Sequence, residues 1–242
     1  GSLQSLIPPI DAGTTQAMQK EASQVSDVGR EPGTLPGNAR VDEGKKKPAS
    51  SVSMPLEQFQ GRGTIVKRLG VFDLETQRSA QEVGGWHRAD LMKGSCAVLY
   101  DAREQVYHEY LEKDIPRFIE HLKQYDCVVG FNIRRFDYKV LSGYSDFDFR
   151  KLSTLDLLAE IHKQLGYRLS LDHLAKVTLG SQKSADGLQA LRWWKQGKIR
   201  EIIDYCRQDV RITWEIYCFG KENGYLLFQN KAGNTVRVPV SW

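Results

Sequence analysis

The sequence has no apolar run that approaches the ~20 residues needed to cross a bilayer, so it predicts no membrane-spanning helix. Its first residues, Gly1-Ser2-Leu3-Gln4, lack the basic and then apolar segments of a signal peptide, and we expect a cytoplasmic protein. No Met precedes Gly1. We therefore expect the natural chain to extend further towards the N-terminus.

Cysteine is also sparse, and the four thiols lie far apart: Cys96, Cys127, Cys206 and Cys218. No two of them have the spacing of zinc ligands, and a cytoplasmic protein keeps its thiols reduced. We therefore expect four core residues rather than disulfides or a zinc site.

Residues 1–60 lack most of what a folded core needs. Phe59 is their only aromatic residue, and six of the eight prolines lie there among Ser, Gly, Gln and Thr. Such a segment cannot bury enough apolar surface to offset the entropy lost on ordering. The composition predicts a disordered tail or linker over 1–60, a folded domain over 61–225, and a C-terminal hairpin over 226–242 that packs on the domain.

A strong net charge of either sign is missing too, because 34 Lys and Arg stand against 30 Asp and Glu. Residues 1–60 carry slightly more acids than bases, so the basic excess falls on the predicted domain. A basic surface around an acidic pocket suits a polyanion such as nucleic acid. An ordinary solvated basic surface would show the same modest excess.

The pattern after residue 60 predicts an α/β domain. Three stretches predict the strands of an antiparallel meander. A short apolar stretch predicts a strand that is buried on both faces and parallel to the first strand. Most of the remaining residues predict helices. The predicted strands are 65–72, 95–100, 105–111 and 127–131, and the predicted helices are 114–125, 136–144, 155–165, 171–179, 188–196 and 199–223. Stretches 225–229 and 235–240 predict a terminal hairpin, and 84–87 a polar loop.

Two carboxylates lie one residue apart where the first predicted strand ends, in Val71-Phe72-Asp73-Leu74-Glu75-Thr76. In a strand, residues i and i+2 point to the same face, so Asp73 and Glu75 are expected side by side. Their repulsion would be relieved by a hard divalent cation, Mg²⁺ or Mn²⁺, which takes oxygen ligands. For this pair alone, a solvated strand end is the alternative.

Two further acids lie on helix faces that are expected to point towards the sheet. Asp137 opens a predicted helix whose apolar residues Val140, Leu141 and Tyr144 follow at helical spacing. Asp209 lies at the edge of the apolar stripe of the last helix, one turn after Tyr205. Four acids on three elements suit a two-metal site for phosphodiester cleavage. Taken singly, Asp137 could be an ordinary first-turn acid, and Asp209 a boundary acid paired with an arginine.

Three motifs, in this order, resemble those of a known superfamily. Asp73-Leu74-Glu75, Asn132 through Phe136-Asp137, and Tyr205 with Asp209 resemble the exonuclease motifs of the DEDD superfamily in its tyrosine-bearing (DEDDy) branch. The stretch 169–183, followed by Gly187 and Trp193-Trp194, is similar to the helicase-associated ribonuclease H-like exonucleases, and the chain is also similar to the proofreading domain of family B DNA polymerases. The resemblance covers 65–225 and implies a ribonuclease H-like mixed sheet, with three antiparallel meander strands plus parallel strands, flanked by helices.

The resemblance also implies roles for single residues. Asp73, Glu75, Asp137 and Asp209 would hold two divalent cations, Mg²⁺ or Mn²⁺. Tyr205 would position the attacking water, since a phenol with a pKa near ~10 is a poor base at neutral pH. The residues expected at the terminal nucleotide or at a phosphate are Leu74, Thr76, Asn132, Phe136 and Lys183.

The implied activity is 3′–5′ exonuclease cleavage that releases 5′-mononucleotides. Single-stranded DNA is the preferred substrate, RNA is a second one, and a helicase is an implied partner, in cis or in trans. A nucleic-acid-binding or helicase-docking module without turnover is one alternative, and a structure-selective endonuclease is another.

Several residues keep two interpretations. Trp86 and His87 could stack on bases or cover the edge of a core. Arg134 and Arg135 are phosphate contacts or plain surface charges. Asp156, which follows Ser153-Thr154-Leu155, is expected to cap the helix that it opens.

Overall fold

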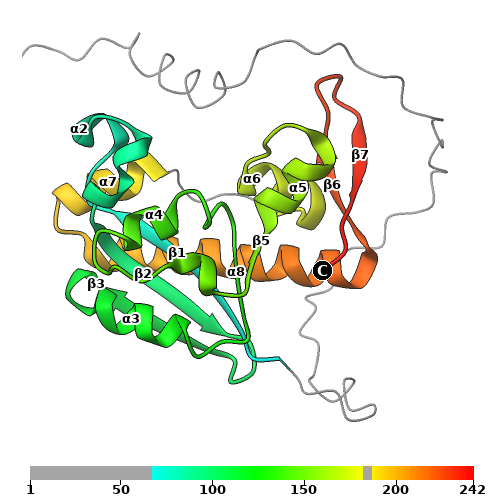
Figure 1. Ribbon diagram of the computed structural model, residues 1–242. Coiled ribbons are helices and arrows are strands. Elements are labelled where there is room, and N and C mark those ends of the chain that lie inside the picture. Colours follow the sequence, from blue (N-terminus) through cyan, green and yellow to red (C-terminus); the bar gives the residue numbers. More distant parts are fainter. Residues whose placement is uncertain (1–66, 182–186) are drawn as a thin grey trace, which may run out of the picture. The chain divides into compact units, whose positions relative to one another are not determined.

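A mixed sheet of five strands organises the part of the chain that the computed structural model describes, residues 67–181 and 187–242 (Figure 1). The strand order is β3-β2-β1-β4-β5, with antiparallel pairing among β1, β2 and β3 and parallel pairing among β1, β4 and β5. The strands are β1 (Leu69–Thr76), β2 (Gly94–Asp101), β3 (Val106–Leu111), β4 (Cys127–Gly130) and β5 (Thr154–Asp156). This arrangement confirms the predicted fold class. The sequence does not reveal β5, because its three residues are too few to show an alternating pattern.

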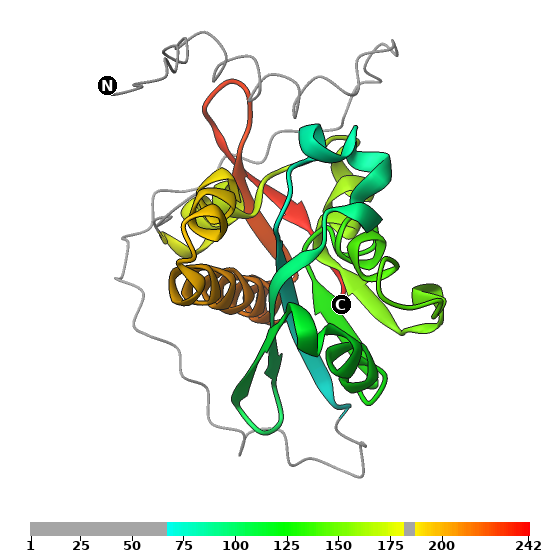
Figure 2. The same cartoon turned by 90° about the vertical axis from the view of Figure 1, so that its left-hand side faces the viewer.

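The central strand β1 is buried because helices cover the sheet on both faces (Figure 2). Val71 packs in a cluster with residues of the long helix α8, among them Val210. Phe72 and Leu74 pack in a second cluster, on the other face, which includes Phe118. Neighbouring residues of β1 thus face opposite sides of the sheet, as the pleat of a strand requires.

The predicted helices appear in the predicted order, some of them with shorter ends. The helices of the structure are α2 (Ala80–Val83), α3 (Ile115–Leu122), α4 (Asp137–Leu141), α5 (Leu157–Leu165), α6 (Leu171–Leu174), α7 (Gly187–Lys195) and α8 (Ile199–Asn223), with short turns η2 (Trp86–Leu91), η3 (Glu112–Asp114), η4 (Phe149–Lys151) and η5 (Ala175–Leu179). The predicted helix 171–179 is α6 followed by the π-helical turn η5, which ends at Gly180 with a left-handed φ of 68°. None of the described helices is long and apolar enough to cross a membrane.

The segment after β1 is not the polar loop that the sequence predicts. The Ser79 hydroxyl accepts a hydrogen bond from the Glu82 amide (3.3 Å), and the Glu82 carboxylate accepts one from the Ser79 amide (2.7 Å). This reciprocal pair is a capping box and begins α2, which is followed by the 3-10 helix η2. The Ser-x-x-Glu spacing is a recognised sequence signal for a helix start, so the sequence does contain the information for this helix.

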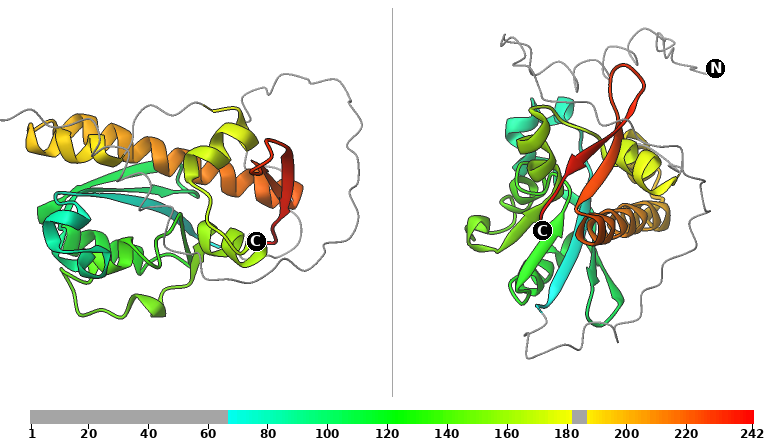
Figure 3. Two further views of the ribbon diagram at one scale, coloured as in Figure 1. Left: turned by 90° about the horizontal axis from the view of Figure 1, so that it is seen from above. Right: turned by 90° about the vertical axis from the view of Figure 1, so that its right-hand side faces the viewer.

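The C-terminal residues form a hairpin of β6 (Tyr225–Gln229) and β7 (Thr235–Pro239), which Figure 3 shows at the C-terminal end of α8. Leu226, Phe228 and Val238 are buried in the same cluster as the apolar face of α8. The Trp242 indole donates a hydrogen bond to the Tyr217 carbonyl (3.0 Å). The predicted tail 1–60 and Lys183 lie outside the described residues.

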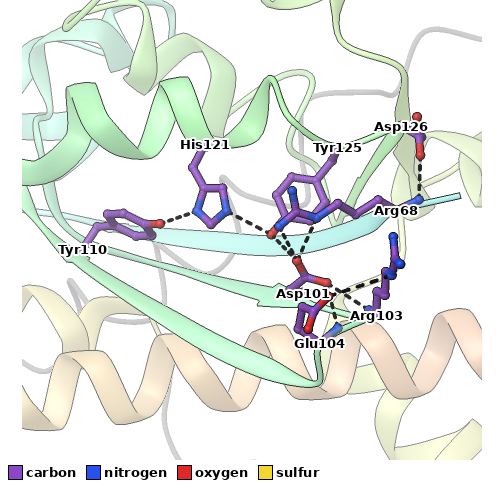
Figure 4. Close-up of polar contacts among 8 residues, drawn as sticks. All are labelled: Arg68, Asp101, Arg103, Glu104, Tyr110, His121, Tyr125 and Asp126. Carbon is purple, nitrogen blue, oxygen red and sulfur yellow. Dashed lines mark hydrogen bonds and ion pairs between the residues drawn. The ribbon is translucent and has the colours of Figure 1, made fainter.

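At the amino end of β1, a buried carboxylate joins several elements (Figure 4). Asp101 has 0% of its surface exposed and accepts hydrogen bonds from the Arg68 guanidinium (2.8 Å) and the Tyr125 hydroxyl (3.1 Å). Its other oxygen accepts from the amides of Arg103 (3.0 Å) and Glu104 (3.1 Å), which turn the chain from β2 into β3. Burial alone would raise the pKa of Asp101, but these hydrogen bonds lower it below its ordinary value.

Candidate metal centre

Carboxylates from two distant parts of the chain meet near the carboxyl end of β1. Asp73 and Glu75 share one face of the strand, and α8, which carries Asp209, packs against β1. One oxygen of each residue lies within 4.8 Å of the others. All three side chains are half-buried, so a small ion from solvent can reach them.

The fourth acid, Asp137, lies outside that group but close enough to act on it. It is the first residue of α4, with 2% of its surface exposed, and its Oδ1 has no hydrogen-bond partner among the described residues. Burial raises the pKa of Asp137 to about 8, the Asp156 carboxylate adds to the shift, and the backbone amides of Asp137 and Leu74 oppose it. A buried carboxylate oxygen without a partner is costly in a folded protein. It therefore points to a ligand that the polypeptide does not supply.

The electrostatics of Asp73 point to the same kind of ligand. Burial raises the pKa of Asp73 well above its ordinary value, and the negative charges of Asp137, Glu75 and Asp209 raise it further. A divalent cation would remove this repulsion. Because every donor is a carboxylate oxygen, the residues fit a hard cation such as Mg²⁺ or Mn²⁺.

Tyr205 lies one turn before Asp209 on α8 and is buried. Its ring packs edge-on against Trp193 of α7, with ring centroids 6.3 Å apart. Burial raises the pKa of the Tyr205 phenol, and so do the charges of Asp209, Glu75 and Asp73 and a hydrogen bond with the Asp209 carboxylate. The phenol therefore stays protonated at neutral pH and is placed to donate a hydrogen bond.

Cys206 contributes to the site although the sequence indicates only a core residue. Its thiol lies 3.3 Å from the Asp73 carbonyl oxygen and 3.5 Å from the Asp73 carboxylate, and it is placed to donate its one hydrogen to either of them. Cys206 stands in the apolar stripe of α8, three positions before Asp209. The sequence therefore indicates the role of Cys206 through its position on the same helix as Asp209. The residue type, cysteine, does not indicate it.

The comparison with protein-family models decides the family. The model for the RNase H superfamily matches residues 71–219, which is more than half of the chain and spans the four acids and Tyr205. The chain belongs to the RNase H superfamily. Membership suggests a hydrolase that acts on nucleic acid, in a fold that normally uses divalent metals.

Among solved structures, the chain is similar to the family B DNA polymerase from the hyperthermophilic archaeon Pyrobaculum calidifontis. The match has a TM-score of 0.49 and 16% sequence identity, and it covers 64% of this chain and 24% of the polymerase. The chain thus spans about a quarter of the polymerase's length. A search of curated proteins gives no match.

In this member of the RNase H superfamily, one buried carboxylate holds the turn that leads to Asp137. Asp156 accepts hydrogen bonds from the backbone amides of Asn132 (2.8 Å) and Arg134 (3.0 Å). It also caps α5 by accepting from the Ala159 amide (3.2 Å), which confirms the predicted capping role. The contacts with the turn come from the side-by-side pairing of β4 and β5, which the sequence did not show.

Replacing Asp156 with Ala should destabilise the protein by about 2–3 kcal/mol, because three part-buried backbone amides would lose the acceptor of their hydrogen bonds. The turn would also loosen, so Asp137 would lose its fixed place beside Asp73. Asp156→Asn keeps one acceptor oxygen and should lose about half as much. Urea unfolding of both variants at neutral pH measures the difference, and equal stability of wild type and Asp156→Ala would contradict the assigned role.

Four of the five residues expected at the substrate lie in the described part of the chain, and Leu74 does not share the face of the acids. Leu74 is buried in the core on the opposite face of β1, and the buried Thr76 hydroxyl donates to the Arg78 carbonyl (3.1 Å). Asn132 has a left-handed φ of 68°, and its side-chain oxygen accepts a hydrogen bond from Arg168 (2.6 Å). Sequence reasoning missed Arg168, because a lone exposed arginine in a loop carries no spacing signal. Phe136 immediately precedes Asp137.

Proposed function

We propose that the protein is a metal-dependent 3′–5′ exonuclease of the DEDDy type. The observation that carries the proposal is the convergence of Asp73, Glu75 and Asp209 near a buried oxygen of Asp137 that has no hydrogen-bond partner in the described part of the chain. Four acids in one place repel one another unless a cation binds, and a structural role would not require all of them.

The proposed roles follow from these positions. Asp73, Glu75 and Asp209 would hold one cation, and Asp73 with Asp137 would hold a second. Two such ions, Mg²⁺ or Mn²⁺, supply charge stabilisation for the attacking and leaving oxygens of the phosphodiester. The Tyr205 phenol stays protonated and donates its hydrogen to Asp209, so its oxygen would accept a hydrogen bond from the attacking water and orient that water rather than deprotonate it.

The proposed substrate is single-stranded DNA, with RNA as a second one, cleaved from the 3′ end to 5′-mononucleotides. Thr76, Asn132 and Phe136 would border the terminal nucleotide, and Lys183 would contact a phosphate. Leu74 would meet the nucleotide only through its backbone, because its side chain is buried on the opposite face of β1. A helicase partner, in cis or in trans, remains part of the proposal on the strength of the resemblance alone.

The proposal is tested with 5′-labelled single-stranded DNA and RNA, each with a free or a blocked 3′ end, incubated with the protein in Mn²⁺. We expect stepwise shortening of the unblocked strands only, absent in Asp73→Ala and Asp209→Ala. Cleavage of blocked strands would identify an endonuclease instead. Metal-dependent binding without cleavage would identify a module that lacks turnover.

A further inference from the structure

Trp86 is the most exposed of the large apolar side chains in the described ranges, with 67% of its surface exposed. An indole in water forgoes the free energy that burial would recover. The 3-10 helix that it begins is anchored by other residues, since Ala89 and the following Met92 are fully or almost fully buried. Covering the core therefore does not explain why a tryptophan stands at this position.

The support under Trp86 is fixed on two sides. Asp90 of η2 forms an ion pair with Lys139 of α4 (3.1 Å), and Glu82 of α2 forms one with Lys195 of α7 (2.9 Å). Together with the buried anchors, these contacts hold the segment between β1 and β2 against the helices around the acids, as Figures 1 and 2 show for α4. The indole is thus presented at the surface by a segment whose Ala89 and Met92 are buried in the domain.

Trp86 is connected to the acidic cluster through Phe136. Its segment leaves β1 directly after Glu75 and Thr76. Its ring meets the Phe136 ring edge to face, with centroids 5.7 Å apart and an interplanar angle of 69°. Phe136 is the residue before Asp137. A nucleotide whose phosphate reached the carboxylates would have its base within reach of the two rings.

We propose that Trp86 and Phe136 form a stacking platform for an unpaired base of a single-stranded nucleic acid. The position of the phosphate in this proposal rests on the proposed nuclease function. Stacking on an aromatic ring tolerates any base, because every base has a π face. The bases of a duplex end are already stacked and paired, so the platform selects unpaired ends. The acidic cluster would act on the phosphate, which single and double strands share, so it would not distinguish unpaired ends from paired ones.

The platform is tested by binding, which does not require turnover. Fluorescence anisotropy is measured in Ca²⁺ with a 5′-labelled oligothymidylate and with an oligonucleotide of equal length whose 3′-terminal nucleotides are abasic, and gels check that both stay intact. The wild-type protein should bind the oligothymidylate about tenfold more tightly, since each stacked base contributes a comparable factor in other proteins. Equal affinity for the two probes, or binding of neither, would overturn the platform.

Substitutions separate stacking from apolar cover. Trp86→Leu keeps an apolar side chain without a π face and should lose most of the preference for the oligothymidylate, as should Trp86→Ala, whereas Trp86→Phe should keep most of that preference. Leu91→Ala, at the other exposed end of η2, is the matched control and should bind like wild type. A Trp86→Leu protein that keeps the full preference contradicts the platform and would point to a surface for a protein partner. Binding preference without any cleavage in Mn²⁺ would refute the nuclease and leave the platform standing.

Discussion

Replacing Asp73 with Asn should stabilise the cation-free protein and abolish both its stabilisation by Mn²⁺ and its cleavage of nucleic acid. Burial and the charges of Asp137, Glu75 and Asp209 raise the pKa of Asp73, so the ionised carboxylate opposes folding at neutral pH. Asn has the same shape without the charge. It also lacks the charge that a cation would require, so the cleavage rate should fall by about a thousandfold or more.

Thermal unfolding in EDTA and in Mn²⁺, together with initial cleavage rates, measures the three effects. The matched control is Asp204→Asn on α8, which removes an exposed carboxylate that pairs with Arg200 (2.6 Å). Exposed pairs contribute little, so this variant should resemble wild type in both conditions. A lower melting temperature of Asp73→Asn in EDTA, or undiminished stabilisation by Mn²⁺, would show that the acids do not form a cation site.

The acids could be foreseen from the sequence because local periodicity decides which way each one faces. Asp73 and Glu75 share a face through the period of a strand, and Asp209 stands at the edge of a helical stripe. The long helix 199–223 was predicted with the bounds that the structure shows, since its apolar stripe spans many turns. That these faces converge within 4.8 Å is a property of the assembled sheet and helix.

What the sequence did not reveal depends on contacts between segments that lack a period. The strand β5 has three residues, and Asp156 meets the turn at Asn132 only because β5 lies next to β4. The thiol of Cys206 lies against Asp73 because α8 crosses β1 at that level. Residue type alone makes a buried cysteine look like an ordinary core residue. Contacts of this kind, between segments far apart in the sequence, can be recognised only in the folded structure.

Replacing Asp101 with Ala should destabilise the protein by about 3 kcal/mol. Asp101 is the last residue of β2 and lies next to the amino end of β1, whereas the acids lie near its carboxyl end. Its buried carboxylate satisfies the Arg68 guanidinium, the Tyr125 hydroxyl and two backbone amides (Figure 4). The variant would leave these donors without an acceptor, and the cost of a lost partner exceeds the value of the bond itself. Asp126→Ala is the matched control, since Asp126 accepts from the exposed Arg68 amide (2.7 Å), and it should lose about 1 kcal/mol or less.

The same carboxylate predicts how stability changes with pH. Because the hydrogen bonds hold the pKa of Asp101 below its ordinary value in the folded state, its contribution is fully present above the unfolded pKa of about 4. The contribution is lost as the pH falls through the lower folded pKa. Urea unfolding of wild type and Asp101→Asn from neutral pH to about pH 3 should therefore show a stability difference that narrows in the acid range. A stability difference that stays constant over this range would contradict the prediction. It would mean that the negative charge of Asp101 does not contribute to stability.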